Sequence, residues 1–335
     1  MTRLAPEAPL ALALGRLLAP TLTGEVARET LPSSREVCRF TFSSNGAAVV
    51  GKFYRAYPAA TPADKGLAQE YDNYLLAAEL GLTDGLARIP RLLGRRPDLR
   101  LGLLLAAVPG PDLDGLIRYA CEQGGLADLH RGLESLAELF VFFHSRRLPE
   151  TPISFLEALG YLDKLLWQLQ RLGLLTPEDE AALAVEKTAW VSILAKYPDR
   201  QVLVHGDATP TNFLFPGNGG RGRPPYARAV ALDLERLRAA DRLWDLSWVA
   251  GELKHAWAWR TGNAAAAEAA IGHFFNVYLA ASHDAPSLAE RLYFLNPFYM
   301  ALAELRIARN SYLDWDYRRW LVAEARGCLA GGRRL

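Results

Sequence analysis

Three polar side chains in the segment 202–235 have the types and the spacing of a phosphoryl-transfer centre. Asp207 and Asn212 stand five positions apart, and Asp233 ends the next apolar run. A phosphoryl group in transit carries dispersed negative charge, which Mg²⁺ held by oxygen ligands neutralises. The spacing therefore predicts that Asp207 accepts the proton of the attacking hydroxyl, while Asn212 and Asp233 bind the metal.

Short apolar runs must position these three side chains. Residues 202–204 are β-branched or apolar, Asn212 opens the run NFLF, and residues 229–232 form a further apolar run. Runs of this length between turn residues are typical of buried strands. We therefore expect the three side chains to be presented by loops between short strands.

The order of these motifs resembles the aminoglycoside phosphotransferase and choline kinase family, which shares the protein-kinase-like fold. The motifs are His205-Gly206-Asp207 with Asn212, the run Leu232-Asp233-Leu234-Glu235, and Asp245 within RLWDLSWVA. The resemblance implies an α+β fold of two lobes, with a small antiparallel sheet in the N-terminal lobe and a mainly helical C-terminal lobe. It also implies that His205 braces the catalytic loop, and that a buried Asp245 accepts hydrogen bonds from the backbone of that loop. The alternative for Asp245, an exposed helix acid, fits poorly with its apolar neighbours.

Length and composition agree with two lobes. A chain of 335 residues is longer than one average domain. We expect a nucleotide-binding lobe over residues 1–108, which includes a helical extension over 1–22, and a catalytic and substrate-binding lobe over 109–335. The apolar run near the N-terminus resembles a signal-peptide core, but Arg16 interrupts it and no convincing cleavage site follows, so a helix is favoured.

Charge and cysteine content limit the partners and the compartment. The 38 Lys and Arg residues nearly balance the 37 Asp and Glu residues, so no overall basic field attracts nucleic acid or an anionic membrane. No apolar stretch is long enough to cross a bilayer. Cys38, Cys121 and Cys328 are scattered, which favours free thiols in a reducing cytoplasm.

Lys52 and Glu70 are the expected phosphate-binding pair. Alternating apolar residues on both sides of Asn45-Gly46 predict a hairpin. The match to G-x-x-x-x-G-K at 46–52 lacks the Ser or Thr of a P-loop and the helix that should follow, so we reject it. In the family scheme Lys52 contacts the α- and β-phosphates of ATP, and Glu70 on the next helix holds it extended. Glu79 is the less favoured partner, and an ordinary surface Lys and Glu remain an alternative.

Other nucleotide contacts follow from the resemblance alone. The connector Leu105, Ala106, Ala107 and Val108 would bond the adenine through its backbone. The first strand-to-strand turn lacks glycine, so Ser33 and Ser34 could touch phosphate, although a plain turn explains them equally well. Asp112 and Asp114 could reach ribose or substrate, but capping of the following helix is favoured.

The acceptor site is expected among the late helices. Six of the tryptophans lie between residues 244 and 320, together with Glu252, Glu304, Asp314 and Asp316. Aromatic and acidic side chains together could hold a cationic amine or stack on a sugar, whereas core packing is the favoured role for any single Trp. His144, at the end of a predicted helix, is interpreted as structural.

These residues predict an ATP- and Mg²⁺-dependent kinase that phosphorylates a hydroxyl of a small molecule, such as a sugar, an amino alcohol or an aminoglycoside. A catalytically inactive module that binds nucleotide or a partner is an alternative, which the presence of Lys52, Asp207, Asn212 and Asp233 disfavours. A protein kinase is disfavoured because no long activation segment separates Asp233 from the next helix.

Overall fold

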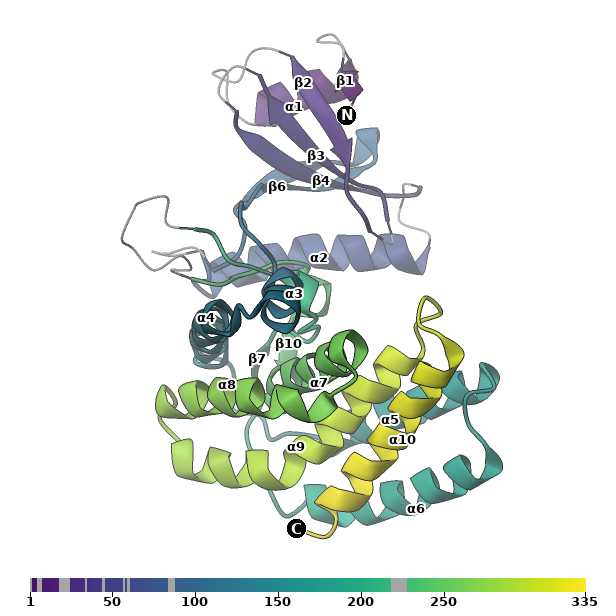
Figure 1. The fold of residues 1–335 in the computed structure, drawn as a ribbon. Helices are drawn as coiled ribbons and strands as arrows, with labels where there is room; N and C mark the ends of the chain where they lie inside the picture. The colour runs from purple at the N-terminus through teal and green to yellow at the C-terminus, as the bar shows by residue number, and fades with distance from the viewer. Residues whose placement is uncertain are drawn as a thin grey trace. The chain divides into compact units, whose positions relative to one another are not determined.

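The fold is known from a computed structural model (Figure 1), which describes residues 2–4, 8–17, 25–33, 35–43, 46–56, 58, 61–83, 88–217 and 228–335. The chain divides into two compact units. Unit 1 comprises Met1–Gly110, Leu214–Pro225 and Val230–Leu237, and unit 2 comprises Pro111–Phe213, Tyr226–Ala229 and Arg238–Leu335. The segment Val230–Leu237, which the sequence assigned to the second lobe, thus packs with the first.

Unit 1 is built on a six-stranded antiparallel sheet (Figure 1). Its strand order is β1 (Thr2–Leu4), β2 (Val26–Thr30), β3 (Val37–Phe42), β4 (Ala48–Phe53), β6 (Leu101–Ala106) and β5 (Leu92–Arg96). Alternation along β3 and β4 places Phe40, Phe42 and Phe53 in one buried cluster. Gly46, with a φ of 69°, takes the left-handed conformation that the predicted turn requires; Asn45 lies outside the described residues.

Two helices accompany this sheet. Helix α1 (Pro9–Leu17) contributes Leu14 to the buried cluster. Helix α2 (Pro62–Glu79) is capped by the preceding residue, Thr61, whose side chain accepts the backbone N–H of Asp64. Within the helical extension expected over residues 1–22, Pro9–Leu17 form the helix α1, whereas Thr2–Leu4 form strand β1 and pair with β2. Residues 1, 5–7 and 18–22 lie outside the described residues. The short helices η1 (Pro97–Leu99) and η3 (Leu234–Arg236) complete the described part of unit 1.

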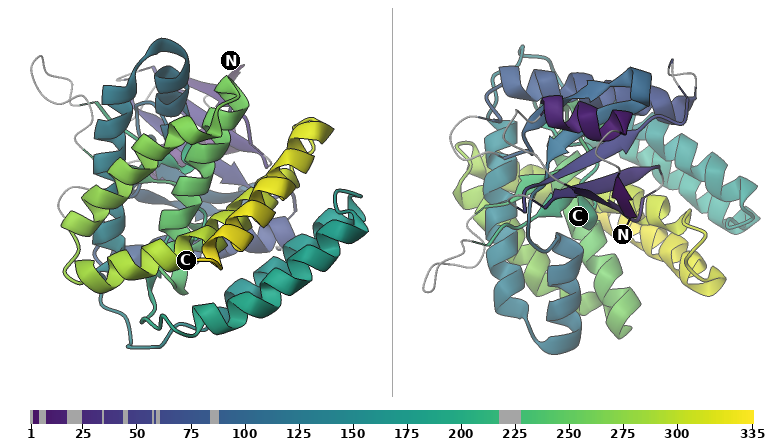
Figure 2. Two further views of the ribbon diagram at one scale, coloured as in Figure 1. Left: turned by 60° about the horizontal axis from the view of Figure 1, so that its bottom comes forward. Right: turned by 90° about the horizontal axis from the view of Figure 1, so that it is seen from above.

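Unit 2 is mainly helical. Its helices are α3 (Leu113–Gln123), α4 (Leu126–His144), α5 (Phe155–Arg171), α6 (Pro177–Leu194), α7 (Leu243–Thr261), η4 (Ala264–Ala267), α8 (Glu268–Ala280), α9 (Ala285–Ala308) and α10 (Trp315–Gly332). Helix α6 starts with a capping box, since Thr176 and Asp179 each accept a backbone N–H from the other. Helices α9 and α10 lie side by side (Figure 2), and α7 packs on α9.

Short strands carry the loops that matter for chemistry. In unit 2, β7 (Val202–Val204) pairs with β10 (Arg238–Ala240), and the short helix η2 (Pro210–Asn212) follows the loop after β7. Strands β8 (Phe213–Leu214) and β9 (Val230–Ala231) also pair with each other. All three residues of β7 are buried, which gives the following loop a fixed starting point.

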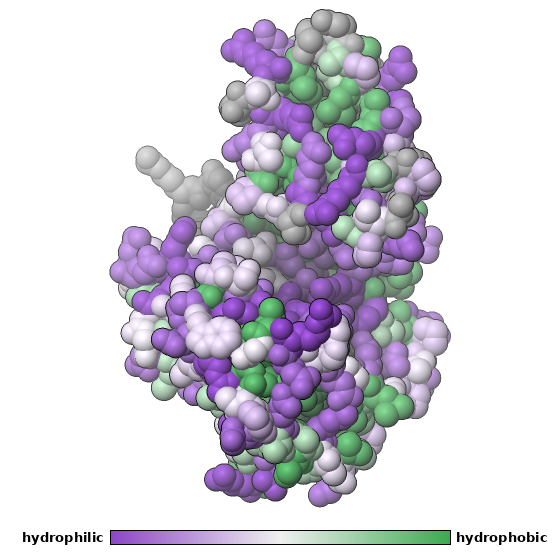
Figure 3. Space-filling model, turned by 90° about the vertical axis from the view of Figure 1, so that its right-hand side faces the viewer, coloured by the Kyte–Doolittle hydropathy of each residue, from purple (hydrophilic) through white to green (hydrophobic). Residues whose placement is uncertain are grey.

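The surface is predominantly polar on the face that Figure 3 presents, where apolar residues occur only in small separate groups. Within the described ranges, no helix combines the length and the apolar character needed to span a bilayer.

Candidate active site

The loop after β7 presents Asp207. Gly206 has a φ of 77°, a left-handed conformation in which a side chain would be strained. The backbone oxygen of Asp207 accepts hydrogen bonds from the backbone N–H of Thr209 at 2.7 Å and from Nδ2 of Asn212 at 3.0 Å. The loop therefore closes on itself, and its side chains have a defined direction.

Asp245 anchors this loop from α7. Its side chain is fully buried, with Oδ2 accepting the N–H of His205 at 2.8 Å and Oδ1 accepting the N–H of Gly206 at 2.9 Å. Burial by itself would raise the pKa of Asp245, but the hydrogen bonds that it accepts from His144 and from the backbone N–H of Gly206 outweigh burial and lower it. Asp245 is thus a charged acceptor that fixes two backbone amides of the loop.

His144, at the end of α4, supports Asp245 in turn. Its Nε2 lies 3.2 Å from Asp245 Oδ2, and its Nδ1 lies 2.6 Å from the hydroxyl of Tyr278. Burial lowers the pKa of His144, which favours the neutral ring. A neutral ring that donates to Asp245 accepts a hydrogen bond from the Tyr278 hydroxyl at its other nitrogen, so both ring nitrogens have partners. Tyr278 was not singled out in the sequence.

Asp207 also contacts two side chains of unit 2. Thr209 Oγ1 donates to Asp207 Oδ1 at 2.9 Å, and Arg306 Nη2 donates to the same oxygen at 2.6 Å. Arg306 lies on α9, 99 positions further along the chain. Arg306 could not be selected from the sequence, because a single Arg inside a helix carries no local signal for a contact of that range.

In unit 1, Lys52 on β4 forms ion pairs with two carboxylates. Its Nζ lies 2.7 Å from Glu70 Oε1 and 2.8 Å from Asp233 Oδ1. Burial alone would lower the pKa of Lys52, but the two carboxylates outweigh burial and raise it, so the ammonium form is favoured. Glu70 is buried on α2, whereas Glu79, the less favoured candidate, is exposed.

Asp233 is held in a strained conformation. Its φ of 57° is left-handed, a region that Asp tolerates better than most residues. The helix η3 that follows is fixed on α2, because Asn73 Nδ2 donates to the backbone oxygens of Leu234 and Glu235. Arg35 also binds the Glu235 carboxylate at 2.5 Å. Neither Asn73 nor Arg35 lies in a motif that would have selected it from the sequence alone.

Asn212 in unit 2 and Asp233 in unit 1 each carry a side-chain oxygen of the hard type that Mg²⁺ prefers. The amide nitrogen of Asn212 is engaged with Asp207, so its side-chain oxygen is the atom suited to a cation. Among the described residues, no three His, Cys, Asp or Glu side chains form a ready metal site. Phosphate oxygens and water would have to complete the coordination, as is usual for Mg²⁺.

The remaining nucleotide candidates lie in unit 1. Ser33 is exposed and its Oγ accepts the N–H of Arg35 at 3.4 Å, while Ser34 lies outside the described residues. In the connector 105–108, the N–H groups of Ala106 and Ala107 donate to Arg91 and Ala48. Those two amides are therefore used within the sheet, and contacts of the connector with adenine remain a prediction.

The late acidic residues have separate surroundings. Glu252 is buried on α7 and lies 3.4 Å from Arg306 Nη1, whereas Glu304 is buried on α9 and lies 2.9 Å from Lys254. Asp314 caps α10 by accepting the N–H of Tyr317, and Asp316 is exposed. The four acids therefore do not share one common partner.

Several aromatic side chains of unit 2 pack against one another on α5 and α7. Tyr161 on α5 packs against Trp244 and Trp248 of α7, with ring centroids 5.4 and 6.0 Å apart. Trp244, Trp248 and Trp257 are buried, while Trp259 and Trp315 are exposed.

The two aspartates near the start of α3 both have structural partners. Asp112 caps α3 by accepting the N–H of Gly115, and Asp114 forms an ion pair with Arg260.

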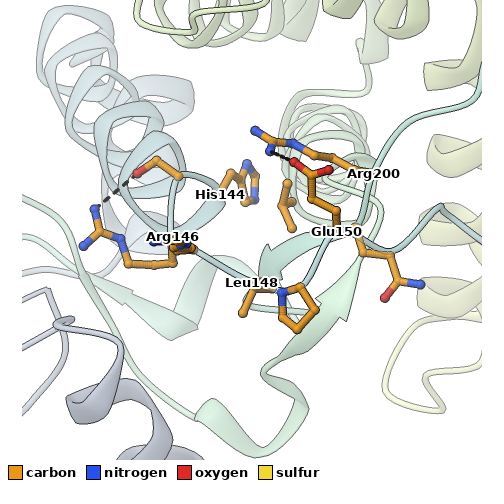
Figure 4. Close-up of a pocket in the computed structure, with 10 residues that line it drawn as sticks. His144, Arg146, Leu148, Glu150 and Arg200 are labelled. Atoms are coloured by element: carbon orange, nitrogen blue, oxygen red, sulfur yellow. Dashed lines mark hydrogen bonds and ion pairs between the residues drawn. The ribbon is translucent and has the colours of Figure 1, made fainter.

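A polar cavity of about 670 Å³ opens beside His144 at the end of α4 (Figure 4). Arg146 points away from the labelled Arg200 and Glu150, and its Nε donates to the backbone oxygen of Phe142. Arg200 lies 3.8 Å from Glu150. Of the residues with an expected role, the cavity includes only His144, so it is distinct from the loop that presents Asp207.

The fold and these loops define a protein-kinase-like phosphotransferase, and comparison with known proteins agrees. A family model described as the phosphotransferase enzyme family matches residues 30–289, so the chain belongs to this family. No curated protein sequence matches significantly.

Solved structures share the fold at low sequence identity. An ethanolamine kinase from Plasmodium vivax has a TM-score of 0.60 at 13% identity, covering 90% of this chain and 82% of its own. The ADP-bound aminoglycoside phosphotransferase APH(2'')-Ib has a TM-score of 0.57 at 15% identity, covering 97% and 99%. The GDP complex of aminoglycoside 2'-phosphotransferase-IIIa has a TM-score of 0.58 at 14% identity, covering 98% and 99%. The predicted family and fold class are thereby confirmed.

Proposed function

We propose that this protein transfers the γ-phosphoryl group of ATP, with Mg²⁺, to a hydroxyl of a small molecule. The observation that carries the proposal is the ammonium of Lys52 bound between Glu70 and Asp233. A cation held by a buried acid and a candidate metal ligand is what nucleotide phosphates require. The solved relatives bound to ADP and GDP support nucleotide binding by this fold.

Each residue has a proposed task. Lys52 binds phosphate oxygens and Glu70 keeps it extended. Asn212 and Asp233 hold Mg²⁺, which supplies charge neutralisation for the transferred group. Asp207 orients the acceptor hydroxyl and accepts its proton. His205, Gly206 and Asp245 fix the backbone that carries Asp207.

The acceptor is proposed to be a hydroxyl-bearing small molecule because the relatives include an ethanolamine kinase and aminoglycoside phosphotransferases. The three cysteines are free, which supports a reducing cytoplasm as the place of action.

The test is release of ADP from ATP across a panel of sugars, amino alcohols, aminoglycosides and protein substrates. Acceptor-dependent release by the wild-type protein, lost in Lys52→Ala, would support the proposal. Tight nucleotide binding without transfer to any acceptor would instead favour the inactive nucleotide-binding module.

A further inference from the structure

Arg306 places a positive charge directly on the proposed base. Its Nη2 lies 2.6 Å from Asp207 Oδ1, and both Nη atoms lie 3.3 Å from Thr209 Oγ1. The side chain is only 16% exposed, so solvent screens this charge weakly. Burial alone would lower the pKa of Arg306, but Asp207 and Glu252 outweigh burial and raise it, so the guanidinium stays charged.

Carboxylates lie on both sides of this guanidinium. Opposite Asp207, Nη1 of Arg306 lies 3.4 Å from Glu252 Oε1, and the guanidinium carbon lies 5.6 Å from the Trp248 ring centroid. Tyr161 and Tyr312 are also close enough to interact with Arg306 electrostatically. The guanidinium therefore has an acidic partner at each Nη atom and an aromatic ring beside it.

This arrangement disfavours a cationic acceptor. The reacting hydroxyl must reach Asp207, so the atoms next to it lie beside Arg306. An ammonium group there would meet a like charge, and both groups are hydrogen-bond donors without an acceptor. The other acids expected to attract a cation do not compensate, since Glu304 pairs with Lys254 and Asp314 caps α10.

An anionic acceptor is disfavoured for the opposite reason. A carboxylate or phosphate that approached Arg306 would meet Asp207 and Glu252, which already flank the guanidinium. Neutral hydroxyl and ether oxygens avoid both conflicts, because they accept hydrogen bonds from Arg306 and donate them to the carboxylates.

We propose that the acceptor is an uncharged polyhydroxyl compound, a sugar or a polyol, and that Arg306 is the specificity-determining residue that excludes amines next to the phosphorylated hydroxyl. The inference rests on the proposed function, and it goes further by naming the substrate class. It differs from the acceptors named for the aminoglycoside phosphotransferases of the same fold.

The experiment uses pairs of acceptors that differ in one hydroxyl or amine, such as glucose and glucosamine, together with kanamycin and ethanolamine. Steady-state ADP release is measured for wild type, Arg306→Gln, Arg306→Lys and Arg309→Gln. Arg309 is the matched control because it directly follows the end of α9, three residues after Arg306, and its Nη1 binds Gln168 at 2.6 Å. Arg306→Lys retains the positive charge but not the guanidinium contacts, so it distinguishes the effect of the charge from the effect of losing those contacts.

For wild type we expect kcat/KM to favour the hydroxyl member of each pair by at least about tenfold. Arg306→Gln should reduce that ratio at least about fivefold through a lower KM for the amine, whereas Arg306→Lys and Arg309→Gln should keep it. A wild-type preference for the amine, or an unchanged ratio in Arg306→Gln, would overturn the inference. The double variant Arg306→Gln with Glu252→Gln restores the charge balance if the single variant folds poorly.

Measuring the binding of kanamycin tests the inference even if no acceptor in the panel is phosphorylated. The dissociation constant for kanamycin, measured by calorimetry, should be at least about tenfold lower for Arg306→Gln than for wild type and Arg306→Lys. Equal constants would overturn the inference. Failure of the proposed function has a different signature: wild type would not bind Mg²⁺-ATP, would bind it without phosphorylating any acceptor, or would bind it no better than Lys52→Ala.

Discussion

At the scale of single residues, the two aspartates proposed for catalysis have different surroundings and therefore different tasks. Asp207 contacts Thr209 and Arg306 in unit 2, while Asp233 contacts Lys52 in unit 1. The first is proposed to orient a hydroxyl, and the second lies with the residues proposed to bind phosphate and metal.

Asp207→Asn should leave the affinity for Mg²⁺-ATP nearly unchanged and lower turnover at least about 100-fold, since a positioned base typically contributes that much. Asp233→Ala should instead weaken Mg²⁺-ATP binding itself. Calorimetric titration of both variants with nucleotide, beside steady-state kinetics, checks the assignment. Loss of nucleotide binding in Asp207→Asn with retention in Asp233→Ala would show that the two roles are reversed.

Glu252 should make stability depend on pH. Burial raises its pKa from 4.5 to about 7, although Arg306 pulls it down. The folded chain therefore binds the proton more tightly than the unfolded chain, so this stabilisation is full below about pH 4.5 and is lost as pH rises through about 7.

Urea unfolding of wild type and Glu252→Gln between pH 5 and pH 8 measures this effect. The stability of wild type relative to the variant should fall with rising pH, by at most about 3 kcal/mol over the full window. Exposed Glu79, changed to Gln, serves as the control and should show no such trend. Parallel curves for wild type and Glu252→Gln would contradict the assignment.

At the scale of elements, close contact between α7 and α9 brings Glu252 and Arg306 together. A Cβ added at Gly251 on α7 would lie 2.7 Å from the Cβ of Ala303 on α9, which is closer than real side chains approach. Gly251→Ala should therefore separate the helices and destabilise the protein by about 1–3 kcal/mol.

Gly272→Ala on α8 is the matched control, because nothing lies within 4 Å of the added Cβ. That change should stabilise the helix by up to about 1 kcal/mol, since Ala is the better helix former. Urea unfolding of both variants distinguishes them. Equal effects of the two changes would mean that α7 and α9 tolerate separation.

Local sequence predicts elements well when their own residues determine them. Thr176 and Asp179 mark the start of α6, and Gly46 marks a turn, because caps and turns depend on residues a few positions apart. Strand β1 could not be predicted in this way, since Thr2–Leu4 become a strand only by pairing with β2. The motif from Asp207 to Asn212 could be recognised in the sequence because its residues are also only a few positions apart. Arg306, by contrast, reaches Asp207 only through the packing of α9.

At the scale of the whole molecule, ligand binding should be visible as stability. Mg²⁺-ATP at 100 times its dissociation constant should stabilise the chain against urea by about 2.7 kcal/mol if it binds only the folded state. Lys52→Ala should lose most of this gain because the proposed phosphate contact is removed. Lys65→Ala, which removes an exposed lysine of α2, should keep it. Identical gains in both variants would argue against a phosphate-binding role for Lys52.

Helix α7 has a consequence for how this phosphotransferase can change over evolution. Asp245, which anchors the catalytic loop, and Glu252, which flanks Arg306, are seven residues apart on this one helix. Seven residues make two turns, so both side chains leave the same side of α7 with a separation of about 10 Å along its axis. An inserted or deleted residue between them would rotate one by about 100° relative to the other. If Arg306 selects the acceptor as proposed, acceptor preference in this lineage can diverge by substitution along α7, whereas the length of α7 between Asp245 and Glu252 must stay constant.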